Sequence, residues 1–122
     1  MLIVYHTSSM SQDKNHKKEV KMKYNELKKK IFRVGYICKG SIGISYRKCG
    51  KAYCRCAKAR NEKEKHGPYL LWTRKIKSKT VTKKLSEKQA QLCNEFIQNS
   101  RTLDEILQQM RDLSDQAINL EK

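Results

Sequence analysis

The sequence is poor in apolar residues, and this limits how the chain can fold. Hydrophobic residues make up 38% of the 122 positions, and the mean hydropathy is -0.85. A chain of this length has room for one domain, but these residues supply little material for its core. We therefore expect folding to depend on a further source of stability: a structural metal, a partner subunit, or a nucleic acid that neutralises charge.

Hydrophobic segments long enough for targeting or membrane insertion are also missing. No run approaches the roughly 18 apolar residues of a membrane span. The apolar start at residues 1–5 is too short for the hydrophobic part of a secretory signal, and no basic residue precedes it. We therefore predict a cytoplasmic protein without a membrane partner. In that reducing compartment, clustered cysteines indicate metal ligands rather than disulfides.

Groups suited to catalysis are scarce. The sequence has no glycine-rich phosphate-binding loop and no recognisable set of Ser, His and Asp. Glu62 and Glu64 are the acidic residues of the basic part, residues 46–84, and they lie in a loop of mixed charge. This part of the chain therefore has no paired carboxylates for catalysis. Only a nucleophilic pair such as Cys49 with His66 could serve an enzyme. We therefore predict a binding protein with no catalytic residue.

Positive charge is the most prominent property of the residues that are present. Lys and Arg number 28 against 12 Asp and Glu, so the formal net charge is +16. The net charge is +7 over residues 1–45, +12 over residues 46–84 and -3 over residues 85–122. A basic body of this kind repels itself unless an anionic partner is near, which favours a nucleic acid. The C-terminal part is better suited to contacts with protein.

The N-terminal part predicts a flexible lead-in over residues 1–13, followed by a helix over residues 14–35. Apolar side chains in the second range repeat at steps of three and four, which indicates one face of an amphipathic helix. They are Val20, Tyr24, Leu27, Ile31 and Val34. Lysines cover much of the rest, so this basic helix offers a second surface for a phosphate backbone. Binding to an anionic membrane would require more Trp or Phe than Phe32 alone.

Residues 40–85 predict a small cysteine-rich β module. Residues 40–47 alternate between apolar and small or polar side chains, as in a half-buried strand. Residues 69–74 have strand composition, residues 77–79 can turn, and residues 80–83 can return as a hairpin partner. These segments predict an antiparallel sheet of three strands, with the cysteines in a loop between the first two. Such a sheet is too small to stand alone.

The C-terminal part, residues 86–122, predicts two helices. Ser86 and Gln89 have the spacing of a capping box and begin a helix that extends to about residue 99. A second helix over residues 102–121 carries a coiled-coil seam, with apolar residues at alternating steps of three and four. The seam consists of Leu103, Ile106, Met110, Leu113, Ala117 and Leu120. It is too short for an isolated coiled coil, so we expect it to form a helical hairpin with the preceding helix or to pair with another chain. The predicted fold class is α+β.

Three cysteines and a histidine predict a metal site. Cys49, Cys54 and Cys56 lie within a stretch of eight residues, and nine residues separate Cys56 from His66. Three thiolates and one imidazole are a standard ligand set for structural zinc. Gly50 would let the chain curl back toward the ion, and neighbouring Lys and Arg residues would favour the thiolate forms. We therefore predict a structural Zn²⁺ bound by these four side chains.

Other interpretations of the cysteines stay open. The spacing differs from that of the common zinc fingers, and the residues could instead be small buried side chains in a loop-rich core. Cys54 and Cys56 match a redox-active pair poorly. Cys38 could complete a four-cysteine site in place of His66. Cys93 lies on an apolar helix face and is expected in the core.

The same part of the chain resembles a known family. The segments KCGK at 48–51, CRCA at 54–57 and HGPY at 66–69 carry the resemblance, together with GSI at 40–42 and Tyr46. They are similar to the core of a family of small uncharacterised prokaryotic basic proteins, some of which are encoded in transposons and other mobile elements. The resemblance spans residues 40–85. It implies that the cysteine loop and the sheet form one module, and that the protein belongs to a mobile-element context.

Basic and aromatic residues alternate around the cysteine loop. Basic side chains release counterions from phosphates, and exposed aromatic rings stack on unpaired bases, so the mixture favours DNA or RNA. The predicted nucleic-acid-binding residues are Arg47, Lys48, Lys51, Tyr53, Arg55, Lys58, Arg60, Arg74 and Lys75. Tyr46, Tyr69 and Trp72 could instead form the core of the sheet.

Two functions are consistent with these features. The first is a small zinc-stabilised nucleic-acid-binding protein, an accessory subunit of a mobile-element or ribonucleoprotein complex. The alternative is a protein-interaction adaptor that forms a homodimer or docks on a protein partner through its C-terminal seam. The first predicts affinity that falls steeply with salt. The second predicts an association that polar substitutions in the seam abolish.

Overall fold

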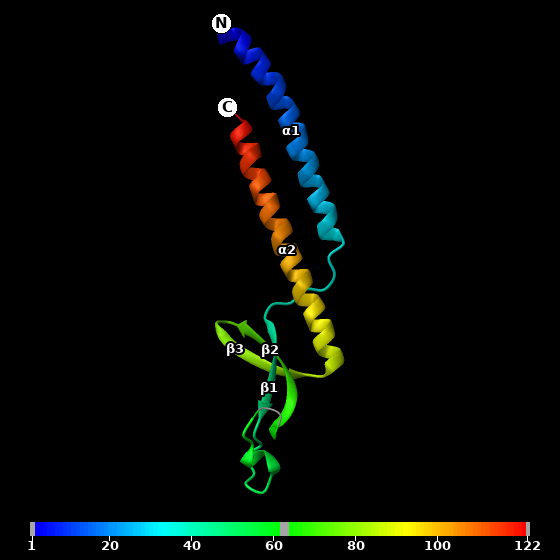
Figure 1. The fold of residues 1–122 in the computed structure, drawn as a ribbon. Coiled ribbons are helices and arrows are strands. Elements are labelled where there is room, and N and C mark those ends of the chain that lie inside the picture. Colours follow the sequence, from blue (N-terminus) through cyan, green and yellow to red (C-terminus); the bar gives the residue numbers. More distant parts are fainter. Residues whose placement is uncertain (1, 62–63, 122) are drawn as a thin grey trace. The chain divides into compact units, whose positions relative to one another are not determined.

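The structure is a computed structural model that describes residues 2–61 and 64–121, with side chains from residue 14 onward in the first helix. Figure 1 shows two long helices and a small sheet. In chain order the elements are α1 (Leu2–Phe32), β1 (Ser41–Arg47), the 3-10 helix η1 (Arg55–Lys58), β2 (His66–Ile76), β3 (Lys79–Leu85) and α2 (Glu87–Leu120). This order confirms the predicted α+β fold. The chain forms two compact units: residues up to Gly35 together with those from Arg101 onward, and Tyr36–Ser100.

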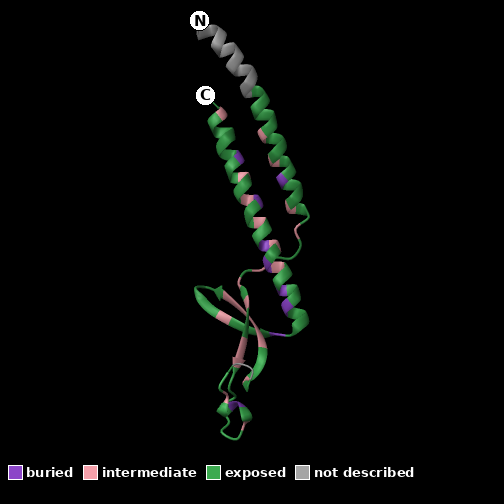
Figure 2. Ribbon diagram, in the orientation of Figure 1, coloured by how far each residue is buried: buried purple, intermediate pink, exposed green. Residues whose placement is uncertain are grey.

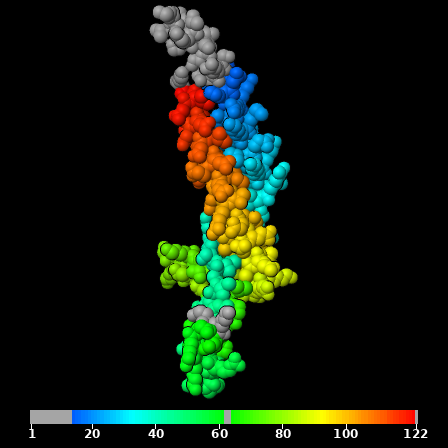
Figure 3. Space-filling model, in the orientation of Figure 1, coloured from blue at the N-terminus to red at the C-terminus, as the bar shows by residue number. Residues whose placement is uncertain are grey.

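The helical unit is a pair formed by α1 and the C-terminal part of α2, which lie side by side in Figures 1 and 3 and run in opposite directions. Leu27 of α1 is buried with Ile106 and Leu113 of α2. The partly buried residues around them are Val20, Tyr24, Ile31, Val34 and Met110. Lys17 and Glu121 form an ion pair at 2.9 Å. The two helices therefore pack through the apolar faces that their periodicity predicted.

The division of the C-terminal part into two helices was wrong. α2 is continuous, so the break predicted between residues 99 and 102 is absent, and so is a helical hairpin within residues 86–122. The helix contains neither Gly nor Pro, so no residue in it stops a helix at that point. The seam packs on α1 of the same chain instead of on the preceding helix. Ile106 and Leu113 are buried, Leu103, Met110 and Leu120 are half-buried, and Ala117 is exposed.

The flexible lead-in predicted for residues 1–13 lies outside the residues whose side chains the structure describes. The bounds of α1 begin at Leu2, twelve residues before the predicted helix start at residue 14. Within the described residues, no helix combines the length and the apolar character that crossing a bilayer requires.

The second unit is a three-stranded antiparallel sheet in the order β1-β2-β3, with the N-terminal part of α2 packed on one face. Leu85, Ala90, Cys93 and Ile97 are buried at this contact. The sheet residues packed against them, Ile42, Leu70 and Trp72, occupy one face because Ile42 pairs with Trp72 and Leu70 pairs with Leu85. Figure 2 shows half-buried residues along β1 and β2 and buried residues along this part of α2.

Two local features fix the ends of these elements. The predicted capping box is confirmed: the Ser86 backbone N–H donates to Gln89 Oε1 at 2.9 Å, and the Gln89 N–H donates to Ser86 Oγ at 3.1 Å. The β2–β3 turn is also where it was predicted. Lys77 and Ser78 have φ values of 50° and 67°, the left-handed pair that a tight two-residue hairpin turn requires.

Candidate metal centre

The cysteine loop, residues 48–65, connects β1 to β2. The regular pairing of these strands ends at Ser45 and Tyr69, and after a register shift Arg47 pairs with His66. Gly67 makes this close approach possible, because a Cβ atom there would lie 2.8 Å from the Ser45 carbonyl oxygen. His66 consequently lies opposite Arg47, two residues before Cys49.

Short-range turns bring the second and third cysteines back toward the first. Gly50 has a φ of 81°, which confirms the predicted reversal of the chain at this residue. The Cys54 backbone N–H then donates to the Lys51 carbonyl at 3.1 Å. The 3-10 helix η1 follows, in which the N–H of Ala57 donates to the Cys54 carbonyl at 3.0 Å. Cys54 and Cys56 therefore sit at the start of a helical turn facing the strand ends.

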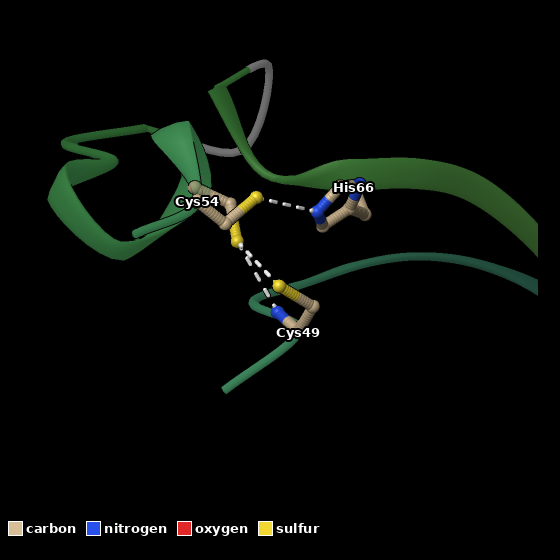
Figure 4. Close-up of side chains that lie close together, drawn as sticks. Cys49, Cys54 and His66 are labelled. Atoms are coloured by element: carbon tan, nitrogen blue, oxygen red, sulfur yellow. Dashed lines mark hydrogen bonds between the residues drawn. The ribbon is translucent and has the colours of Figure 1, made fainter. Parts of the chain in front are cut away.

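The ligand atoms of Cys49, Cys54, Cys56 and His66 all lie within 4.8 Å of one another. Cys56 Sγ is 3.5 Å from Cys49 Sγ, and Cys54 Sγ is 3.1 Å from His66 Nε2 (Figure 4). Four such atoms bound to one zinc ion would be about 3.5 Å apart, so the cluster needs only small shifts to surround a metal. These four residues could hold a metal ion.

The environment of the cluster differs from one thiol to another. The backbone N–H of Cys56 and the His66 side chain lower the pKa of Cys54 to about 6, so this residue is a thiolate at neutral pH. The backbone N–H of Cys49, 3.2 Å from Cys56 Sγ, favours the Cys56 thiolate, but burial and the neighbouring thiols outweigh it and raise the pKa of Cys56. A bound cation would favour both thiolates. Cys56, at 2% exposure, is the buried member of the group, whereas Cys49 and His66 are exposed.

The other two cysteines lie in the core of the sheet unit, where the sequence placed Cys93. Cys38 Sγ is 3.9 Å from Cys93 Sγ and 3.6 Å from the Cys93 carbonyl oxygen. Cys38 packs against the cluster that contains Leu85 and Ile97. Burial raises the pKa of Cys93 to about 11, so its thiol stays protonated. The group that could hold a metal therefore contains His66, and the alternative with Cys38 as the fourth ligand is not what the structure contains.

The cluster lies inside a recognised sequence family. A family model described as a domain of unknown function, DUF6788, matches residues 13–92. The chain belongs to this family. The DUF6788 segment contains most of α1 up to Phe32, the sheet, the cysteine loop and the start of α2. No match was found among curated proteins or among solved structures. The general prediction of an uncharacterised family is confirmed, and the mobile-element context stays a prediction.

The residues predicted to bind nucleic acid all lie in the DUF6788 segment, but they are not equally available. Those in and beside the loop are exposed: Arg47, Lys48, Lys51, Tyr53, Arg55, Lys58 and Arg60. Tyr53 is 85% exposed, with the Lys51 ammonium 5.9 Å from its ring centre. Lys75 is exposed on β2. Arg74 differs from the others: its guanidinium stacks 3.6 Å from the Trp72 ring, and its Nη1 atom is buried without a hydrogen-bond partner.

Lys84 is an exposed cation that the sequence-based prediction of binding residues left out. The predicted β3 ended at residue 83, whereas the strand continues to Leu85 and includes Lys84. The Lys84 ammonium lies 4.2 Å from the centre of the Tyr69 ring. Alternation could have found it, because the apolar Leu85 marks the core side of the strand and its neighbour must face the other way.

Proposed function

We propose that this protein is a small, non-enzymatic nucleic-acid-binding protein whose basic cysteine loop is held together by zinc. One observation carries the proposal: four ligand atoms lie within 4.8 Å of one another in a loop rich in positive charge. The cysteine loop, residues 48–65, contains 7 Lys and Arg and 2 Glu. A metal that fixes this loop would also fix the spacing of its cations.

Zinc is the metal that the ligand set favours. Three cysteines and one histidine provide soft and borderline donors, and their number completes a tetrahedron without an open position for substrate. A closed site of this kind stabilises a fold rather than activating water. Thiolate ligands also require a reducing compartment, so a cytoplasmic location is part of the proposal.

Nucleic acid is the partner that the charge favours. The side chains of Arg55 and Lys58 in the loop, and of Arg47 at the end of β1, are exposed. Their guanidinium and ammonium groups can contact phosphates and release counterions. Tyr53, at 85% exposure, adds an aromatic face that can stack on an unpaired base.

The adaptor alternative has less support. Its seam residues Ile106 and Leu113 are buried against α1, so docking through them would require the two helices to separate. We therefore favour binding to nucleic acid through the loop. From the sequence resemblance alone, we further propose that the protein acts as an accessory subunit of a mobile-element or ribonucleoprotein complex.

The metal is tested by elemental analysis of the full chain, purified without chelator. We expect about one equivalent of zinc, and loss of loop structure when the metal is removed. Less than about half an equivalent, together with unchanged circular dichroism and amide exchange in chelator, would contradict the zinc site.

Nucleic-acid binding is tested by fluorescence anisotropy over a range of salt concentrations. The variant with Arg47, Arg55 and Lys58 changed to Glu should bind nucleic acid more weakly. For a single strand, the slope of log K against log salt concentration should be shallower by about 2. The matched control carries the same change of charge at three exposed positions of α2, Lys88, Arg101 and Arg111. Equal losses in both variants would indicate a general charge effect instead of a site at the loop.

A further inference from the structure

The face of the sheet opposite α2 is not covered by any element in the described part of the chain. Ile42, Leu70, Trp72 and Leu85 face α2. Because side chains alternate along a strand, the residues between them face the other way. On β2 and β3 these are Tyr69, Leu71, Thr73, Lys75, Thr80, Thr82 and Lys84. The second face therefore has a composition of its own, with cations, hydroxyl groups, one aromatic ring and one aliphatic side chain.

Contacts between neighbouring strands confirm that these side chains share a face. The Thr73 and Thr82 hydroxyl oxygens are 3.3 Å apart, and the Lys84 ammonium lies 4.2 Å from the Tyr69 ring centre. The contact between the Lys84 ammonium and the Tyr69 ring holds this cation in place and leaves its outward N–H groups available. β1, β2 and β3 contain no Asp or Glu. The face is thus complementary to an anion.

The same face has open space at Gly43 of β1. A Cβ atom added to Gly43 would meet no atom within 4 Å. Gly43 pairs with Leu71, which in turn pairs with Lys84, so a glycine, an apolar side chain and a cation form one row across the sheet. The open space at Gly43 leaves room for a polymer strand to lie against this row.

The face also connects with the cysteine loop. Ser45 and Tyr69 form the last regular pair of the β1–β2 ladder, and the next pair, Arg47 with His66, stands at the base of the loop. A phosphate backbone that contacts Arg47 therefore lies at the end of the sheet where Tyr69 and Lys84 begin the open face.

We propose that a single strand of nucleic acid runs from the cysteine loop across this open face, with Lys75 and Lys84 contacting its phosphates. The inference rests on the proposed function and names its substrate class. A duplex is read by an element that enters a groove, whereas an open sheet face with cations, hydroxyl groups and an aromatic ring suits a strand whose bases are unpaired.

The decisive comparison uses two pairs of lysines with equal charge but opposite faces. In the test variant, Lys75 and Lys84 are changed to Glu. In the control, Lys79 and Lys83 are changed to Glu, and these two pair with Ile76 and Trp72 on the side that faces α2. Both variants are made in the full, zinc-loaded chain, and their folding is checked by thermal melting. If the test variant does not fold, Lys75→Gln with Lys84→Gln replaces it.

Binding is measured with labelled single-stranded RNA, single-stranded DNA and duplex DNA of equal length. We expect the unaltered protein to prefer the single strands. We expect the test variant to lose about tenfold or more in affinity for them, with a salt dependence shallower by about 1.4, while the control changes less than about twofold. Polyglutamate of similar length should compete poorly.

Three outcomes would overturn the inference: equal losses in both variants, no loss in the test variant, or competition by polyglutamate as strong as by RNA. The last would indicate a surface for acidic proteins. The proposed function fails separately, if the unaltered protein binds no nucleic acid or if charge reversal at Arg47, Arg55 and Lys58 has no effect.

Discussion

The Cys54 Sγ atom lies 3.1 Å from the His66 Nε2 atom, although the two residues are twelve positions apart in the sequence. The contact depends on the paired ends of β1 and β2 on one side and on the turn that begins η1 on the other. It joins the two halves of the cysteine loop at the position where a metal would bind.

Removing the histidine should remove the metal. His66→Ala leaves only Cys49, Cys54 and Cys56 as ligands, and we expect zinc content to fall below about half an equivalent after dialysis against a weak chelator. Elemental analysis measures this directly. His16→Ala, an exposed histidine of α1, is the matched control and should keep the metal of the unaltered protein. Full zinc content in His66→Ala would exclude His66 as a ligand.

The thiols of the metal-free protein should react in a fixed order. Because the pKa of Cys54 is lowered to about 6, this residue is a thiolate above that pH and should be alkylated first at neutral pH. Its rate should fall as the pH drops through 6, where the thiolate is protonated. Cys93, whose pKa is raised to about 11, should stay unmodified in the folded protein. Mass spectrometry of peptides after iodoacetamide pulses at several pH values measures the order, and preferential labelling of Cys93 would contradict it.

The helical pair should depend on its few buried residues. Leu113→Ala removes one of three buried side chains shared by α1 and α2, and we expect it to lower the free energy of unfolding by about 2–4 kcal/mol. Ala117→Asp, at an exposed position of the same seam, should change it by less than about 0.5 kcal/mol. Urea unfolding followed by circular dichroism compares the two. If Ala117→Asp instead changed the molecular mass in solution, the seam would be an interface between chains.

Two glycines of the β module should respond differently to the same substitution. Gly40 has a φ of 111°, and a Cβ atom there would overlap the Thr73 carbonyl oxygen and lie 2.8 Å from Trp72 Nε1. We expect Gly40→Ala to destabilise the protein by about 2 kcal/mol or more. Gly43→Ala meets open space and should change the free energy of unfolding by less than about 0.5 kcal/mol. Similar effects at both positions would contradict the packing of Trp72 against the 38–40 segment.

Local patterns were sufficient for most of the elements and for the candidate ligands, but not for the continuity of α2. The capping box at Ser86 and Gln89, the steps of three and four in both helices, and the spacing of the cysteines each depend on neighbours in the sequence. The turn at Lys77 and Ser78 was placed correctly even though neither residue is a typical choice for a positive φ.

Non-local contacts could not be predicted in the same way. The seam on α2 and the apolar face of α1 were both visible, but nothing in either pattern says that Leu113 packs beside Leu27 instead of against another chain. Arg74 was grouped with the exposed cations, whereas the alternation of β2 turns it toward Trp72. Lys84 was missed because the end of a strand depends on its partner, here the pairing of Leu70 with Leu85.

The central claim is that a metal-ordered basic loop binds nucleic acid, and one titration tests both halves together. Affinity for a labelled single strand is measured for the zinc-loaded protein, for the same protein after removal of the metal by a chelator and dialysis, and after one equivalent of zinc is restored. We predict that affinity falls by about tenfold or more in the metal-free protein and recovers with zinc. Equal affinity in all three states would contradict the claim.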